Sequence, residues 1–129
     1  MNILLDTHAL LWLVSRPTTL GSDVVDELAE ADTSIWVSAA SAWEIAIKTR
    51  LGRLDGSTLL ATWGTQLEAM RIDELAIDSH DAILAGGLPW DHRDPFDRVI
   101  VAQALRRSLT VATRDAKILD AALTPTLKV

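Results

Sequence analysis

Four acidic residues lie beside strongly hydrophobic sequence, although they are far apart along the chain. They are Asp6, Glu44, Asp97 and Asp115. A carboxylate in an apolar setting is unfavourable unless it is paired or bound to a metal ion. If the four converged, their oxygens would form a site for a hard divalent cation.

Such a site suits the hydrolysis of phosphodiester bonds. That reaction needs a nucleophilic water, neutralisation of charge on the phosphoryl oxygens and stabilisation of the leaving group. Divalent ions held by carboxylates can serve all three needs. Without a cation the carboxylates would repel one another, and some would take up protons. We therefore interpret the four acids as candidate catalytic residues and metal ligands.

The elements that would position these acids alternate between strand and helix. Short apolar or β-branched runs predict five strands, at residues 2–5, 34–37, 72–77, 109–112 and 126–129. Capping residues and apolar stripes predict helices at residues 7–14, from 22 or 23 onward, 38–51, 57–70, 79–87, 95–107 and 114–121. Thr7, Ser38 and Ser79 are the expected N-caps of three of these helices. This alternation predicts an α/β fold with a mainly parallel sheet covered by helices on both faces.

The predicted elements place all four acids at one edge of the sheet. Ligands of such folds bind at the carboxyl ends of the strands, and Asp6 and Asp115 directly follow predicted strands. Glu44 lies on the second turn of the helix after the second strand. Asp97 lies in the first turn of its helix, where the helix dipole favours a carboxylate. We therefore expect the four side chains around one pocket.

Each acid also has a purely structural interpretation. Asp6 and Asp115 could cap the helices that follow them, with Thr113 as the alternative cap in the second case. Asp97 could stabilise a helix start that is capped by Asp94. Taken one at a time, these interpretations are at least as good as a functional one. Four caps at one strand-end rim are a weaker explanation than one shared site.

The helix that carries Glu44 has the same ambiguity. Ser38, Ser41 and Glu44 are spaced three apart and share one helical face. They could be an N-cap serine with two solvated neighbours. The apolar residues that flank Glu44 indicate that this helix is largely buried, which favours a functional carboxylate.

Length and composition predict one domain over residues 1–129, and 49% hydrophobic residues argue against disorder. The absence of cysteine excludes disulfides and thiolate zinc sites. We see no signal peptide and no apolar run near the roughly 20 residues that span a bilayer. We therefore expect a soluble cytoplasmic protein with no membrane partner.

The net charge of −6 argues against a nucleic-acid partner, but the distribution of charge weakens that argument. Eleven of the twelve basic residues follow Ile47, and several of them are clustered. A basic rim around an acidic metal centre is compatible with a phosphodiester substrate. His80 and His92 are weak signals, and His92 beside Asp91 and Asp94 is interpreted as a solvated or supporting residue. The five tryptophans are interpreted as core or interface residues rather than as base-stacking groups.

Four segments together are typical of a known family. They are Leu4-Leu5-Asp6-Thr7-His8, Val37-Ser38-Ala39-Ala40-Ser41-Ala42-Trp43-Glu44-Ile45, Asp94-Pro95-Phe96-Asp97-Arg98 and Ala112-Thr113-Arg114-Asp115. In their order and surroundings, nearly from end to end, they resemble the PIN-domain ribonucleases, specifically the VapC-type toxins of bacterial toxin–antitoxin pairs. The resemblance implies a three-layer α/β/α PIN-like fold with about five strands.

The resemblance also implies an activity and partners. The activity would be a Mg²⁺- or Mn²⁺-dependent endoribonuclease that hydrolyses RNA and is inhibited by a cognate antitoxin. The protein would be a homodimer, alone or within a larger toxin–antitoxin complex. Five further residues would orient the metal ligands rather than bind metal: Thr7, Ser41, Asp94, Arg98 and Thr113.

The broad apolar faces of the helices expected at 7–14 and 57–70 also predict a protein contact. For the antitoxin, the resemblance implies an amphipathic segment in a groove near the first helices, with a basic side chain brought toward the acids.

Alternative functions come from other classes. A PIN-fold nuclease need not act as a toxin. A phosphatase could use Asp6 as a covalent nucleophile, but such haloacid-dehalogenase-like enzymes usually carry a second Asp two residues later, and here that residue is His8. A non-catalytic binding module with this fold would be expected to lack one or more of the acids, and all four are present.

Overall fold

The computed structural model describes residues 1–129. Five strands form one sheet in the order β3-β2-β1-β4-β5, and every neighbouring pair is parallel. The strands are β1 (Asn2–Leu5), β2 (Ser34–Ser38), β3 (Ile72–Leu75), β4 (Thr110–Thr113) and β5 (Thr126–Lys128). The predicted α/β fold with a parallel sheet of five strands is confirmed.

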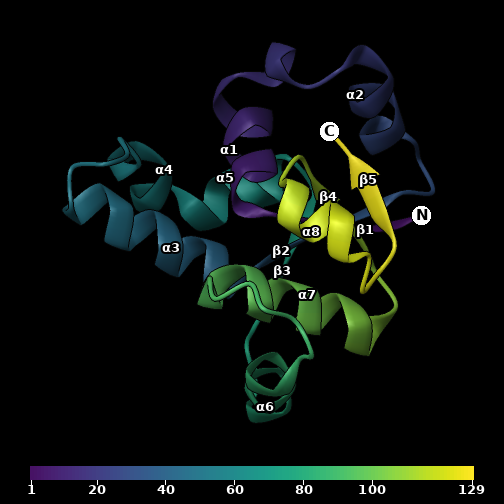
Figure 1. Ribbon diagram of the computed structural model, residues 1–129. Coiled ribbons are helices and arrows are strands. Elements are labelled where there is room, and N and C mark those ends of the chain that lie inside the picture. The colour runs from purple at the N-terminus through teal and green to yellow at the C-terminus, as the bar shows by residue number, and fades with distance from the viewer.

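Helices connect the strands and cover the sheet. They are α1 (Thr7–Ser15), α2 (Ser22–Ala29), α3 (Ala39–Arg50), α4 (Ser57–Ala61), α5 (Trp63–Ala69), α6 (Ser79–Gly87), α7 (Pro95–Arg107) and α8 (Ala116–Ala121), with a 3₁₀ turn η1 (Pro17–Thr19). Figure 1 shows α1 and α2 on one side of the sheet and α7 and α6 on the other. No helix combines the length and the apolarity that crossing a membrane would require.

Two hydrophobic clusters lie on opposite faces of the sheet. Side chains of a strand alternate between the two faces. In β1, Ile3 and Leu5 are buried in the cluster that includes residues of α1, α2 and α5, whereas Leu4 is buried in the cluster under α7. Leu5 is therefore fully buried immediately before Asp6. The packing on both faces fixes where β1 ends and hence where Asp6 lies.

Two predicted helix caps were wrong by one residue. Asp6 rather than Thr7 is the N-cap of α1, because its backbone is extended and its side chain accepts a hydrogen bond from the amide of Ala9. Asp78 rather than Ser79 caps α6, through a reciprocal capping box with Asp81. In both cases the aspartate outcompetes the neighbouring hydroxyl for the free amides of the first turn.

Two predicted boundaries also moved. The helix expected at 57–70 divides into α4 and α5 at Thr62, whose backbone leaves the helical region while its hydroxyl donates to the carbonyl of Thr58. The fourth strand extends to Thr113, and α8 begins only at Ala116, after its N-cap Asp115. Ser38 caps α3 as predicted, and Gly52 follows that helix with a left-handed backbone.

Candidate active site

Asp6 lies at the carboxyl end of the central strand β1 and is 5% exposed. One carboxylate oxygen accepts from the Ala9 amide at 2.8 Å, and the other accepts from the Thr113 hydroxyl at 2.5 Å. Burial raises the pKa of Asp6 above its ordinary value, even though both hydrogen bonds act to lower it. The carboxylate is therefore held firmly in place, but the chain does not fully compensate its negative charge.

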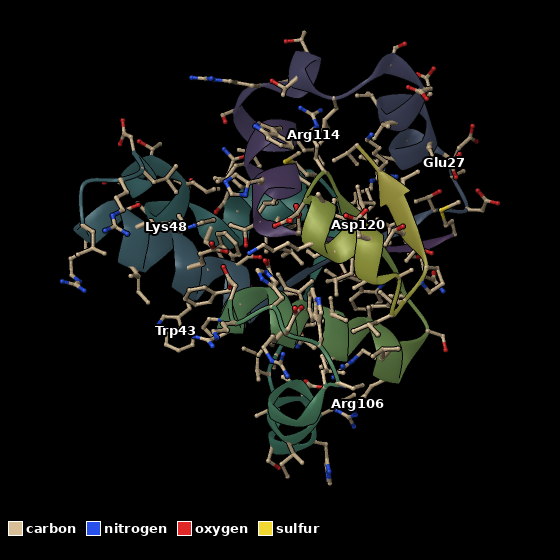
Figure 2. The ribbon with its side chains drawn as sticks, in the orientation of Figure 1. Glu27, Trp43, Lys48, Arg106, Arg114 and Asp120 are labelled. Carbon is tan, nitrogen blue, oxygen red and sulfur yellow. The ribbon has the colours of Figure 1, made fainter.

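Glu44 reaches the same end of the sheet from α3, the helix that follows β2. It is buried, and its Oε2 atom pairs with the ammonium of Lys48 at 2.5 Å, one turn further along α3. Figure 2 shows Lys48 on α3 with its side chain directed toward the middle of the molecule. The rings of Trp43 and Phe96, which adjoin Glu44 and Asp97 in sequence, meet edge to face at 5.1 Å. This contact joins the helices that carry the two acids.

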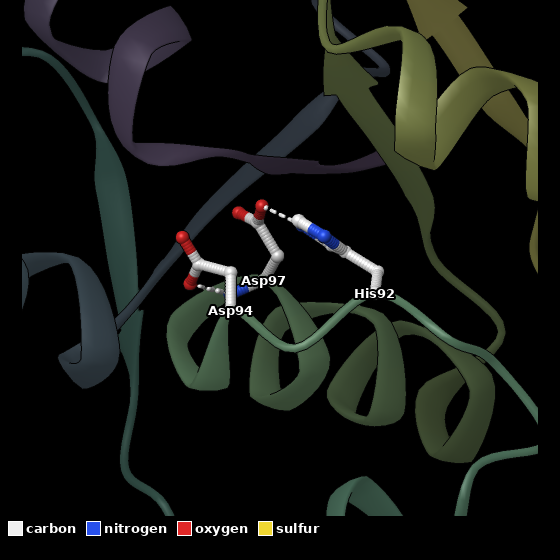
Figure 3. A group of neighbouring side chains, drawn as sticks. All are labelled: His92, Asp94 and Asp97. Carbon is white, nitrogen blue, oxygen red and sulfur yellow. Dashed lines mark hydrogen bonds and ion pairs between the residues drawn. The ribbon is translucent and has the colours of Figure 1, made fainter.

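Asp97 is supplied by the first turn of α7, as predicted. Its Oδ2 atom lies 2.7 Å from the Nε2 atom of His92, and its side chain is 15% exposed. Figure 3 shows the Asp97 carboxylate rising from the start of α7 toward the His92 ring, with Asp94 beside it. Burial raises the pKa of Asp97 from 3.8 to about 6, and the charges of Asp94 and Asp115 add to the effect while the His92 bond opposes it.

Asp115 is the N-cap of α8, and its side chain accepts from the Lys117 amide. Its charge contributes to raising the pKa of both Asp6 and Asp97, so the three carboxylates share one electrostatic environment. Asp115 and Asp6 also line one hollow of about 290 Å³. The structure thus places Asp115 close enough to influence both Asp6 and Asp97, but the group whose ligand atoms lie within 4.8 Å of one another is His92, Asp94 and Asp97. Glu44 lies on α3 and is paired with Lys48.

Three of the residues expected to orient the ligands carry hydroxyl groups that bond to the acids or join the elements that carry them. The Thr113 hydroxyl donates to Asp6 and accepts from the Asp115 amide, so it links two of the acids. The hydroxyls of Thr7 and Ser41 are hydrogen-bonded at 2.9 Å, and both residues are buried. That bond ties the start of α1, next to Asp6, to the helix that carries Glu44.

Asp94 caps α7 as the structural interpretation predicts. Its Oδ1 atom accepts from the amides of Phe96 and Asp97. Asp94 also belongs to the group of metal-compatible side chains whose ligand atoms lie within 4.8 Å of one another, together with His92 and Asp97. The cap therefore fixes the turn that presents Asp97 and adds a further negative charge beside it.

Arg98 holds the segment between α6 and α7. Its guanidinium donates to five backbone carbonyls at 2.7–3.4 Å: those of Ala85, Gly86, Leu88, Trp90 and His92. A guanidinium is suited to this task because its donors are spread over a rigid plane. Through the carbonyl of His92, Arg98 positions the residue whose ring bonds to Asp97.

Basic side chains line two hollows at Asp6 and at its neighbours Thr7 and His8. Lys48 and Arg53 line a hollow of about 270 Å³ together with Thr7 and His8. Arg114 lines the hollow that contains Asp6 and Asp115, where its guanidinium lies 4.4 Å from the centre of the Trp12 ring. The predicted basic rim around an acidic centre therefore has a counterpart at this end of the sheet.

Two residues beside the acids were missed or undervalued from sequence. His92 was treated as a weak signal, but its ring contacts Asp97. Lys48 was recognised only as one of several clustered basic residues, although its spacing of four from Glu44 on a helix could have indicated the pair. The contact of His92 depends on the path of the loop between α6 and α7, and no periodic pattern in the sequence reports that path.

The parallel sheet and the acids at its carboxyl edge define a class of protein. Residues 3–123 match the PIN domain family, and the chain belongs to that family. It is similar to Ribonuclease VapC22 of Mycobacterium tuberculosis, with 28% identity over 118 residues, which cover 91% of this chain and 89% of that protein. The resemblance to VapC-type PIN proteins is therefore confirmed.

Solved structures share the fold. VapBC-1 from nontypeable Haemophilus influenzae superimposes with a TM-score of 0.69 at 17% identity and covers 99% of this chain and 98% of that one. VapBC2 from Rickettsia felis, bound to a DNA fragment from their promoter, gives a TM-score of 0.68 at 14% identity and covers 98% of both chains. At these identities the likeness concerns the fold, and it confirms the expected PIN-like architecture.

Proposed function

We propose that this chain is one nuclease domain, residues 1–129, that hydrolyses RNA phosphodiester bonds with Mg²⁺ or Mn²⁺ as the toxin of a toxin–antitoxin pair. Asp6, Glu44, Asp97 and Asp115 would be its catalytic residues and metal ligands. The proposal agrees with membership of the PIN domain family and with the likeness to a ribonuclease over most of both chains.

The observation that carries the proposal is that the fold holds two largely buried carboxylates in place without a lysine or arginine partner, so that burial raises the pKa of both. Asp6 and Asp97 lie at the ends of different elements, and Asp115 raises the pKa of both. Carboxylates that stabilise a fold are normally paired with cations, which lowers their pKa. A group of acids with unmet negative charge at the carboxyl edge of a parallel sheet fits a hard cation, whose preferred ligands are oxygens.

The residues of the chain have distinct tasks in this proposal. Asp6 and Asp97 would supply the principal oxygens, and Asp115 and Glu44 would complete the set. A bound divalent cation would supply positive charge at the phosphoryl oxygens and acidify a water molecule. Thr113 would hold Asp6 and Asp115 in register, and His92 would hold one oxygen of Asp97 and leave the other free.

Cationic side chains near the acids support a nucleic-acid substrate, and the likeness to Ribonuclease VapC22 supports RNA. Lys48 and Arg53 line the hollow beside Thr7 and His8 and can meet phosphates near the carboxylates. A covalent phosphatase mechanism is less suitable, because His8 stands where such enzymes usually carry a second Asp, two residues after the nucleophile.

We also propose an antitoxin partner and a homodimer, alone or within a larger complex. The structural neighbours include VapBC-1, VapBC2 and a toxin-antitoxin complex from Klebsiella pneumoniae. The broad apolar faces that the sequence predicts at residues 7–14 and 57–70 give only weak support for a protein contact in the structure. Large side chains of α1, α4 and α5, including Trp12, Leu59 and Trp63, are half-buried against the core. Light scattering of the isolated chain should give twice 14.1 kDa, and a monomer would contradict the dimer.

The nuclease proposal is tested by cleavage of single-stranded RNA by the purified chain. We expect no cleavage in chelator, restoration by Mg²⁺ or Mn²⁺, and none by the Asp97→Asn variant with metal present. Asn keeps the shape of the side chain but lowers its charge as a ligand. The exposed Asp73→Asn variant is the matched control and should cleave as wild type. Undiminished cleavage in chelator would contradict the mechanism.

The toxin assignment needs a separate test. Expression of the chain without its antitoxin should arrest growth of a bacterial host, and expression of the Asp97→Asn variant should not. Normal growth of cells that contain the soluble, folded wild type would count against the toxin role and leave the nuclease proposal standing.

A further inference from the structure

A hollow of about 770 Å³ lies between the loop that precedes α7 and the surface of α8, and it is larger than either hollow beside the acids. Trp90, Asp91 and His92 line it from the loop, and Lys117 and Asp120 line it from α8. Figure 2 labels Asp120 on α8. Pockets of about 300–1,000 Å³ are typical of small-molecule and cofactor sites. The hollow is therefore large enough for a nucleotide.

The hollow borders the candidate active site at one residue, His92. His92 lines the hollow, and the Nε2 atom of the same ring lies 2.7 Å from Asp97. The His92 ring also lies beside the ring of Trp90, with 4.9 Å between the centroids and an interplanar angle of 55°. A group bound in the hollow would therefore be separated from the Asp97 carboxylate by a single imidazole.

The lining favours a particular kind of ligand. Trp90 and His92 offer aromatic surface, on which unstacked bases bind. Asp91 and Asp120 are exposed carboxylates whose side chains have no hydrogen-bond or ion-pair partner in the chain. They would repel a phosphate inside the hollow, but they can accept hydrogen bonds from the amino and imino groups of a base. Lys117, also exposed, offers one cation for a phosphate at the edge.

We propose that this hollow binds a base of single-stranded RNA adjacent to the bond cleaved at the acids, and that Asp120 selects among bases. The proposal rests on the nuclease function proposed above, and it adds a substrate subsite to it. Stacking on Trp90 tolerates any base, because every base has an aromatic face. Selection comes from the carboxylate, which accepts hydrogen bonds but cannot donate them.

The test measures binding in the absence of cleavage. The Asp6→Asn protein is used as background, because Asp6 does not line the hollow and its loss should stop hydrolysis. Dissociation constants are measured by fluorescence anisotropy for short labelled RNAs of A, C, G or U alone. Adding Asp120→Asn, which introduces a donor at the same position, should change the ratios between the four constants by roughly fivefold or more.

Two further variants separate base selection from general electrostatics. Lys117→Ala should weaken the binding of all four RNAs by a similar factor and leave the ratios between their dissociation constants unchanged, as loss of a phosphate contact does. Asp73→Asn removes an exposed acid on β3 and should leave the ratios as they are. In nitrogen-15 spectra, the Trp90 indole signal, assigned by Trp90→Phe, should shift when RNA is added.

The proposal is overturned if Asp120→Asn changes the ratios between the four dissociation constants no more than Asp73→Asn does. It is also overturned if the Trp90 indole signal does not shift when RNA is added. A third contradicting result is that Lys117→Ala and Asp120→Asn change the oligomeric mass while the ratios between the dissociation constants stay unchanged. The hollow would then be a contact with another protein chain. Failure of the wild type to cleave RNA would contradict only the nuclease proposal, since the binding ratios are measured without cleavage.

Discussion

Two groups of buried carboxylates in this protein have opposite electrostatic character. At the carboxyl edge of the sheet, burial raises the pKa of Asp6 and Asp97. Between α6 and α7, Asp81 is fully buried, yet its pKa lies well below the ordinary value. All three side chains are aspartates, so the opposite directions of their pKa shifts come from the groups that surround each carboxylate.

Asp81 is surrounded by donors from α7. Burial acts to raise its pKa, but hydrogen bonds from Arg107, Arg106 and Gln103 outweigh that effect, together with the capping bond to Asp78. Figure 2 shows Arg106 close to α6, which α7 contacts at the edge of the molecule. This carboxylate is neutralised within the chain, and it fastens α6 to α7.

Asp6 and Asp97 at the sheet edge lack such neutralisation, whereas Glu44 is paired with Lys48. Asp97 has one imidazole and Asp6 has a hydroxyl and an amide, whereas the nearby Arg114 donates to the carbonyls of Thr19 and Val129. The comparison shows that this protein can fully compensate the negative charge of a buried acid, and that it does so at Asp81, which joins α6 to α7. Where it does not, the missing positive charge is expected from outside the chain, from a divalent cation.

The largest expected difference between the two groups is in activity. Asp97→Asn should lower kcat for RNA cleavage by roughly a thousandfold, the order expected when a group that acts in the transition state is lost. Its unfolding midpoint in chelator should be equal to that of wild type or higher, because the substitution removes a poorly compensated charge. A variant that lost activity only by unfolding would contradict this interpretation of Asp97.

Arg98 should show the largest effect on stability. Arg98→Met leaves five backbone carbonyls without their donor, and bonds from charged donors contribute more than neutral ones. We expect the free energy of unfolding to fall by about 3 kcal/mol in urea titrations. Arg98→Lys should recover only part of the loss, because an ammonium cannot reach all five acceptors. Full recovery by lysine would show that charge rather than the planar fork matters.

Substitution of Asp81 should lower the stability of the fold and leave the activity unchanged. Asp81→Asn should lower the free energy of unfolding by about 2 kcal/mol, less than for a fully buried pair, because Arg106 and Arg107 are partly exposed and can be solvated. Cleavage per folded molecule should be unchanged. Asp78→Asn is the control, since Asp78 is exposed and shares Arg106. A loss of cleavage in Asp81→Asn without unfolding would break the division between the groups.

The two groups should also differ in the sign of their pH dependence. The pKa of Asp97 is raised to about 6, so its contribution to stability is present below the ordinary value of 3.8 and is lost as pH rises through 6. The pKa of Asp81 is lowered, so its contribution is present above 3.8 and is lost at lower pH.

In chelator, wild type should therefore lose more stability between about pH 5 and pH 7 than Asp97→Asn does. Urea titrations of both proteins at the two pH values measure this difference. Parallel profiles would contradict the electrostatic account of Asp97.

Much of the fold could be predicted because its signals are local. The apolar runs predicted all five strands, and the parallel order followed from their alternation with helices. The boundaries that moved depended on competition between adjacent groups, as between Asp6 and Thr7 for the first amides of α1. The helix divides at Thr62, where a hydroxyl bonds to the backbone, and the apolar pattern of residues 57–70 does not report this break.

The site was predictable to the extent that strand ends define it. Asp6 and Asp115 follow strands, and this placed them at one rim before any contact was visible. The contact between His92 and Asp97 could not be predicted, because it depends on Arg98 gathering carbonyls from residues 85–92. The pairing of Asp81 was not anticipated either, since its partners lie 22–26 residues away on another helix.

The most direct test of the central claim is a calorimetric titration of the metal-free protein with Mn²⁺ at neutral pH. The account predicts that wild type and Asp81→Asn bind Mn²⁺ equally, that Asp97→Asn binds at least roughly tenfold more weakly, and that wild-type binding weakens as protons compete below pH 6. Equal binding by wild type and Asp97→Asn, or no binding by wild type, would contradict it.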